Sequence, residues 1–264
     1  GSKMFKFLTV VALVTIISTI CATLFNQLSL SHNLLAGTLP RRLEGKIIDG
    51  EEIPIETAPY QVSLQFGGTH DCGGVIIAKN WVLTARHCVT QPIGHYLILA
   101  GTAYASRAKG GSVHKLAQII THERNDIALI RVEEPFEFDN TRKPIELFAK
   151  NEESAVGSMS TVTGWGWTGF IVPEILNLVN VPIISKDECA ELYGIPDGMD
   201  SQICAAYPEG GKDACSGDSG GPLVVDGRLA GIVSWGVGCA LAGKPGVYAE
   251  VASNRDWIKE NSGV

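Results

Sequence analysis

The chain has 264 residues, 45% of them hydrophobic, and its 30 glycines lie among short β-rich runs, so it can bury a core and is predicted to be all-β. The net charge is −7, and because the first 46 residues hold five basic residues and one acidic residue, the remainder carries −11, from 16 basic and 27 acidic residues. This acidic body excludes nucleic acid as the expected partner and mildly favours cationic substrates, although a solvated acidic surface explains it too.

Residues 1–22 are predicted to be a secretory signal peptide that starts at Met4. Lys3 and Lys6 precede an apolar run over residues 7–20. The alternative is a signal anchor that stays in the membrane, but the run is short for a span of about 20 residues. We therefore expect a secreted, extracellular protein.

A histidine stands at the end of a predicted strand. The apolar run Trp81–Leu83 predicts the strand, and His87 follows it beside Cys88, which would hold the histidine rigidly if the cysteine were bridged. A histidine fixed in this way is a candidate general base. The remaining histidines are expected to be surface or hydrogen-bonded residues: His32, His70, His95, His114 and His122.

Asp126 stands where a second apolar strand begins, at Ile127–Ile130. A carboxylate entering an apolar run is costly to bury unless it is paired. Next to an imidazole it would hold one tautomer and stabilise the imidazolium. Taken alone, the same aspartate would be interpreted as a strand-end cap or a turn residue.

The most specific segment is Lys212–Pro222, in which glycines flank Ser219. Such a serine suggests an exposed nucleophile whose backbone can approach a substrate closely. Residues 217–221 also satisfy the Gly-x-Ser-x-Gly pattern of the α/β-hydrolase nucleophile elbow. That fold needs its histidine after the serine, and all six histidines precede Ser219, so the α/β-hydrolase interpretation is excluded.

The order His87, Asp126, Ser219, with Gly-Asp-Ser-Gly-Gly-Pro around the serine, resembles the chymotrypsin/trypsin family of serine endopeptidases. The resemblance runs from Ile47 to about Ile258. It rests further on the segments Ile47–Gly50, Gly164–Gly166, Ser234–Gly236 and Lys244–Tyr248.

The resemblance implies an all-β fold of two packed antiparallel β-barrels with a C-terminal α-helix and the site in the cleft between them. The first barrel is expected within residues 47–155, and the second, with a helix at about residues 254–261, within residues 156–264. It implies a trypsin-like serine endopeptidase that acts through an acyl-enzyme. Ser219 would attack, His87 would transfer the proton, and Asp126 would orient His87.

The resemblance also assigns the groups around the nucleophile. The backbone N–H groups of Gly217 and Ser219 would form the oxyanion hole. Asp213 would form an anionic pocket floor that suits arginine or lysine. Ala214 stands where many trypsins carry serine. Its lack of a hydroxyl favours arginine, because the planar guanidinium can pair bidentately with the Asp213 carboxylate without one. The pocket walls and the edge that pairs with the substrate backbone would come from Ser234, Trp235, Gly236 and Gly246; a core position is the alternative for Trp235.

Residues 23–46 are expected to be an activation propeptide. By resemblance, cleavage after Lys46 would free the amine of Ile47, which would pair with the buried carboxylate of Asp218 and order the oxyanion loop. The uncut chain is therefore expected to be a zymogen that needs an activating protease, since Lys46 is a poor site for an arginine-preferring enzyme.

Seven cysteines are present, and removal of the signal peptide would take Cys21 and leave six, which alone allow 15 pairings. A zinc site lacks close Cys-x-x-Cys pairs. The resemblance selects three disulfides. It implies that the protein acts on protein or peptide substrates, is bound by protein protease inhibitors and is a monomer. It implies no metal or other cofactor. The implied pairs are Cys72–Cys88, Cys189–Cys204 and Cys215–Cys239.

Three segments depart from the family pattern. Arg86 precedes the histidine where a small residue is usual, so it is expected either to pair with Asp126 and weaken its support of His87, or to extend to solvent. Residues 122–125 are several residues shorter than in vertebrate trypsins, which would open the cleft. Residues 99–115 lack acidic side chains, so no calcium dependence is expected. The short loops resemble those of invertebrate trypsins. Because Arg86 could impair catalysis, the alternative function is a catalytically impaired homologue that acts as a binding or regulatory module.

Overall fold

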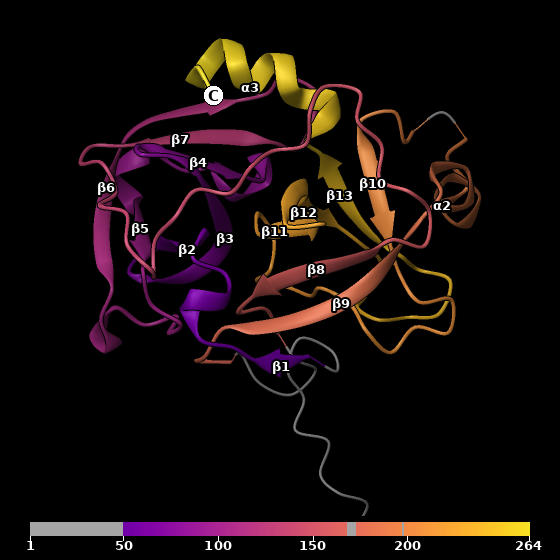
Figure 1. Cartoon of the computed structure of the whole chain (residues 1–264), viewed down its shortest axis with the longest axis horizontal. Helices are drawn as coiled ribbons and strands as arrows, with labels where there is room; N and C mark the ends of the chain where they lie inside the picture. Colours follow the sequence, from indigo (N-terminus) through magenta and orange to yellow (C-terminus); the bar gives the residue numbers. More distant parts are fainter. Residues whose placement is uncertain (1–49, 168–172, 197) are drawn as a thin grey trace, which may run out of the picture. The chain divides into compact units, whose positions relative to one another are not determined.

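Two closed antiparallel β-barrels form the described part of the chain, which a computed structural model gives for residues 50–167, 173–196 and 198–264 (Figure 1). The predicted signal peptide, the propeptide, Lys46 and Ile47 lie outside these residues. None of the helices described is long and apolar enough to cross a membrane.

The first barrel consists of six strands in the order β2-β3-β4-β7-β6-β5. In β2, Val62 and Leu64 point into the apolar core of the first barrel. Gln61 points to the opposite face of the strand and is also buried, because that face lies against the second barrel. Its side-chain carbonyl accepts a hydrogen bond from Thr163 Oγ1 at 2.7 Å. The strands are β2 (Gln61–Phe66), β3 (Thr69–Ala78), β4 (Trp81–Thr84), β5 (Tyr96–Ala100), β6 (Ser112–Thr121) and β7 (Ala128–Val132).

The second barrel is closed by the pairing of β8 with β9 in a sheet of order β1-β9-β10-β13-β12-β11-β8, in which β1 extends the β9 edge. The β11–β12 hairpin turns at Asp226-Gly227, where both residues have positive φ, 50° and 74°. This is the two-residue turn for which Asp-Gly is the strongest sequence signal. The strands are β1 (Glu51–Glu52), β8 (Met159–Gly164), β9 (Asn177–Ile184), β10 (Gln202–Ala205), β11 (Pro222–Val225), β12 (Arg228–Trp235) and β13 (Gly246–Glu250).

Short helices connect and close the barrels. Helix α2 (Lys186–Tyr193) begins after Ser185, whose hydroxyl accepts the Glu188 N–H at 3.0 Å, and the predicted C-terminal helix is confirmed as α3 (Arg255–Ser262). Ile258 of α3 belongs to the same apolar cluster as the core of the first barrel. The 3₁₀ turns are η1 (Ile55–Thr57), η2 (Arg86–Cys88), η3 (Ile93–His95), η4 (Arg107–Lys109) and η5 (Ala252–Asn254).

Candidate active site

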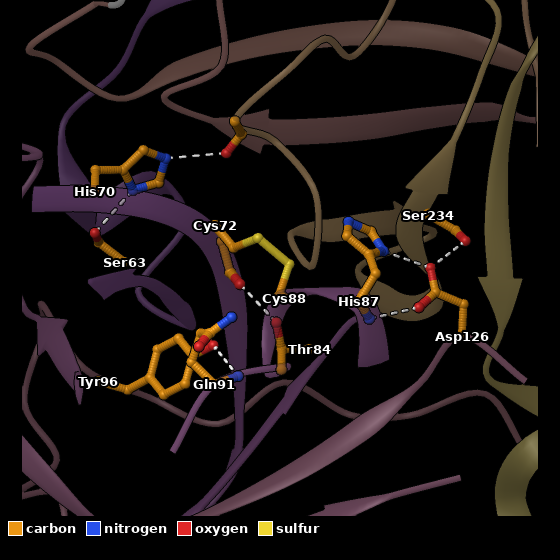
Figure 2. The surroundings of a disulfide bond; sticks show 12 residues. Ser63, His70, Cys72, Thr84, His87, Cys88, Gln91, Tyr96, Asp126 and Ser234 are labelled. Atoms are coloured by element: carbon orange, nitrogen blue, oxygen red, sulfur yellow. Dashed lines mark hydrogen bonds and ion pairs between the residues drawn. A yellow bond between two sulfur atoms is a disulfide. The ribbon is translucent and has the colours of Figure 1, made fainter. Parts of the chain in front are cut away.

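His87 lies in η2, directly after β4, and is fixed from two sides (Figure 2). The Cys72–Cys88 disulfide ties η2 to β3. The Asp126 carboxylate accepts the His87 backbone N–H at 2.9 Å and His87 Nδ1–H at 2.7 Å. Because an ionised carboxylate only accepts, the neutral imidazole carries its proton on Nδ1 and keeps its lone pair on Nε2. The ring can therefore take a proton at Nε2.

Asp126 is held by both barrels. It precedes β7 in the first barrel, and Ser234 Oγ in β12 of the second donates to its Oδ2 at 2.6 Å (Figure 2). Burial raises the pKa of the Asp126 carboxyl, but the hydrogen bonds from His87 and Ser234 outweigh burial and lower the pKa below its ordinary value. The bond to Asp126 raises the pKa of His87, although partial burial opposes the shift.

Ser219 precedes β11 and lines a cavity of about 220 Å³ in the second barrel. Its carbonyl accepts the N–H of Gly73 in β3 at 2.7 Å, and Thr84 at the end of β4 donates to the Gly73 carbonyl at 2.8 Å. These bonds tie the serine loop to the strands that lead to His87. No hydrogen bond between the described residues joins Ser219 Oγ to His87, a contact that commonly tightens only when substrate binds.

The backbone around Ser219 offers two free donors. Within the part of the chain described, the N–H groups of Gly217 and Ser219 have no hydrogen-bond partner. His70, which was expected to be a surface or hydrogen-bonded residue, donates Nε2–H to the Gly217 carbonyl at 2.9 Å and contacts Ser63 Oγ at 2.8 Å (Figure 2). The histidine therefore fixes the peptide unit next to these donors, a role that no local motif signals.

Asp213 lies at the wall of the same cavity, which Ser234, Trp235 and Gly236 also line. Its Oδ2 accepts the Ala240 N–H at 3.0 Å, whereas its buried Oδ1 has no partner among the described residues. Burial raises the pKa of Asp213 to about 6, although backbone hydrogen bonds lower it.

Gly246 faces this carboxylate. A Cβ at Gly246 would lie 2.8 Å from Asp213 Oδ1 and 3.0 Å from the Tyr248 hydroxyl, which is likewise buried without a described partner. Only glycine leaves that space open. The cavity therefore ends in two unpaired oxygens that suit a hydrogen-bond donor carrying positive charge.

Asp218 is fully buried beside the serine. Its carboxylate accepts the N–H groups of Gly166 and Cys215 at 2.7 and 2.8 Å, and no described cation pairs with it. Burial raises the pKa of Asp218 to about 7, despite the two backbone bonds that lower it.

Of the two orientations expected for Arg86, the ion pair with Asp126 is not formed. Its Nη1 donates to the carbonyls of His122 and Glu123 at 3.2 and 2.7 Å, so the guanidinium binds the backbone of the short loop ahead of the aspartate. The interpretation of Arg86 as a competitor for Asp126 is therefore wrong.

The same short loop is held at three further points. His122 Nδ1 accepts the N–H of Asn125 at 3.0 Å and the His122 ring packs edge-on against Trp257 of α3. The Asn125 side chain bonds Asn254 at 2.7 Å and Ser201 at 3.0 Å. The loop is therefore tethered to Asn254, to Ser201 and to Trp257 of α3.

The three disulfides are those that the resemblance implies: Cys72–Cys88, Cys189–Cys204 and Cys215–Cys239. The third joins the segment after Asp213 to the opposite wall of the cavity. Among the described residues, the single cluster with metal-ligand spacing is Cys72, His87 and Cys88, and its two thiols are consumed by a disulfide.

Two six-stranded antiparallel barrels that carry a histidine–aspartate pair beside a serine-lined cavity define the chymotrypsin-type serine endopeptidases. The trypsin family model matches residues 47–258. The chain belongs to the trypsin family.

Its relatives include insect trypsins over most of their length. The chain is 41% identical to trypsin 5G1 of Aedes aegypti over 248 residues, which is 89% of this chain and 91% of that protein. It is 42% identical to the vitellin-degrading protease of Bombyx mori (86% of this chain and 90% of the relative) and 41% identical to trypsin delta of Drosophila melanogaster (86% and 94%). The predicted likeness to invertebrate trypsins is confirmed.

Proposed function

We propose that this chain is the precursor of a secreted endopeptidase that cleaves peptide bonds after arginine and, less well, after lysine. The observation that carries the substrate preference is the buried Asp213, whose Oδ1 is unpaired at the wall of the cavity that Ser219 lines. A guanidinium would supply the missing donors and the compensating charge. Ala214 leaves no hydroxyl to complete the coordination of a lysine ammonium, which supports arginine over lysine.

The reaction would follow from the geometry of the three groups. Ser219 Oγ attacks the carbonyl carbon and passes its proton to His87 Nε2, and Asp126 stabilises the imidazolium that forms. The N–H groups of Gly217 and Ser219 receive the oxyanion, each worth roughly 3 kcal/mol of transition-state stabilisation. Return of the proton to the leaving amine gives the acyl-enzyme, which water then hydrolyses.

Activation would use Asp218. Cleavage after Lys46 would free the Ile47 amine, and its ammonium would pair with this buried carboxylate, which lies one residue before the nucleophile. The three disulfides support a protein made for an oxidising, extracellular setting. Arg86 gives no support to a catalytically impaired homologue, because it binds the His122 and Glu123 carbonyls and leaves Asp126 to His87.

The test is amide hydrolysis by the chain cut at Lys46–Ile47, with arginyl and lysyl substrates that are otherwise identical. We expect a higher kcat/KM for the arginyl substrate and a loss of at least about 10⁴-fold in Ser219→Ala, the scale at which a triad member fails. The uncut Lys46→Gln chain should be nearly inert. Equal turnover by Ser219→Ala would refute the serine mechanism, and equal kcat/KM for the two substrates would refute the arginine preference.

A further inference from the structure

The flank of His87 is open. A hollow of about 600 Å³ lies there, lined by His87, Asp126, Arg86, Arg124 and the small or apolar side chains of Val89, Thr90 and Thr121. Its one acidic lining residue, Asp126, is fully engaged by His87 and Ser234. The hollow therefore presents two arginines and no acidic group free to pair with them.

The two arginines differ in how they are held. Arg86 is anchored, because Nη1 binds two loop carbonyls, so its positive charge is fixed at the hollow without being neutralised. The Arg124 guanidinium has no hydrogen bond or ion pair with a described residue. Glu123, the acidic neighbour of Arg124 on the loop, lines neither this hollow nor the next one.

Arg124 also lines a second hollow of about 250 Å³, together with Ser234 and Trp235. Ser234 in turn lines the cavity that contains Asp213. The free arginine is thus next to the strand end along which a substrate backbone would be added.

An added strand decides which substrate residue meets the arginines. When the cleaved residue enters the Asp213 cavity, the side chain before it points to the opposite face, because side chains alternate along a strand. His87 and the larger hollow share no lining residue with the Asp213 cavity, so we assign them to this opposite face.

We propose that Arg86 and Arg124 form a subsite for an acidic side chain, aspartate or glutamate, at the substrate residue immediately before the cleaved arginine. This subsite rests on the proposed endopeptidase function and refines it. One guanidinium anchored on the loop and one without a described partner offer a carboxylate charge-assisted hydrogen bonds. Since both arginines are exposed, the gain in kcat/KM is expected to be about threefold to fivefold and sensitive to salt.

The experiment uses the cut enzyme and three peptidyl-arginine amides that carry Glu, Gln or Lys before the arginine. We expect the Glu substrate to exceed the Gln substrate in kcat/KM at low ionic strength, the Lys substrate to fall below it, and the differences to shrink in 1 M NaCl. Arg124→Gln, which leaves Arg86 in place, should lower the Glu/Gln ratio towards one. Arg131→Gln is the matched control, because Arg131 is exposed on β7 and lines none of the three hollows.

The outcomes separate the subsite from the endopeptidase function. Turnover of the Gln substrate with a Glu/Gln ratio of one or less overturns the subsite alone. A Glu/Gln ratio that is unchanged in Arg124→Gln, or that falls equally in Arg131→Gln, also overturns it. No turnover of any of the three substrates overturns the endopeptidase function and the subsite with it.

Discussion

The protonation state of Asp213 is expected to control the binding of cationic ligands. Burial raises the pKa of its carboxyl to about 6, and a cationic ligand binds the ionised form. Below pH 6 the carboxyl takes up a proton and binding must displace it, so the affinity for an amidinium should fall about tenfold per pH unit, while above pH 7 it should be constant.

The measurement is the inhibition constant of benzamidine, an aryl amidinium, from pH 5 to pH 8. Asp213→Asn should bind it weakly and without this pH dependence. His87→Ala should keep the dependence, assayed by direct binding, which separates Asp213 from the histidine. A wild-type inhibition constant that is flat down to pH 5 would show that Asp213 is ionised in the free enzyme well below pH 6.

The sequence points to individual candidate residues where their local context is distinctive. Ser219, His87 and Asp126 each stand beside a glycine run, a cysteine or an apolar strand, which gives them a recognisable signature. His70 has none, because its partners, Ser63 and the Gly217 carbonyl, are brought to it by strand pairing and by the second barrel. The orientation of the Arg86 side chain could not be predicted from the sequence either, because its acceptors are backbone carbonyls, which every residue possesses.

Among the elements, the segment from His122 to Asn125 shows how a short loop can be made rigid. Arg86 binds it from η2, Trp257 packs on it from α3, and Ser201 bonds it from the second barrel. A loop held from three sides delivers Asp126 to a fixed place.

Replacement of Arg86 tests that assignment. Arg86→Ala restores the residue type usual in the family, but it removes the cation that binds the His122 and Glu123 carbonyls. We expect kcat to fall about threefold to tenfold with little change in KM, because hydrogen bonds to a charged group are stronger than neutral ones but these are exposed. Arg86→Lys, which keeps the charge and offers the donors of a single ammonium group, should recover part of the loss. A rise in kcat for Arg86→Ala would instead mean that the arginine hinders Asp126.

Strand and helix positions were easier to predict than pairings across the chain. The helix at Arg255–Ser262, expected at about residues 254–261, follows from a local signal, the apolar spacing of Trp257 and Ile258. The pairing of Glu51–Glu52 with β9 does not, because more than a hundred residues separate the partners and two exposed glutamates carry no pattern that selects them.

At the scale of the whole molecule, Asp218 links stability to pH. In the uncut chain its buried carboxyl has a pKa of about 7, whereas the unfolded chain has the ordinary value of 3.8. Between these two pH values the folded state therefore holds one more proton than the unfolded state. The contribution of Asp218 to the free energy of unfolding is fully present below pH 4. It is lost as the pH rises to 7, and the loss is at most about 4 kcal/mol.

Denaturant unfolding of the uncut chain at pH 4, 5.5 and 7 measures this loss. Asp218→Asn serves as the reference because it removes the titration while other histidines and carboxyls still titrate. The difference between the two chains should shrink after cleavage at Lys46–Ile47, if the Ile47 ammonium pairs with Asp218. Parallel pH profiles for the uncut wild-type and variant chains would contradict the raised pKa.

Each barrel forms hydrogen bonds that position candidate catalytic groups of the other barrel. Ser234 of the second barrel fixes Asp126 of the first, and β3 of the first barrel anchors the Ser219 carbonyl and, through His70, that of Gly217. A half-folded chain with one finished barrel would thus be inert, so refolding should restore activity only in its last phase. The same reciprocity limits recombination: a chimera that joins barrels from two distant relatives would fold each half and still mismatch these few cross-barrel bonds, so the two halves are expected to have diverged as a pair.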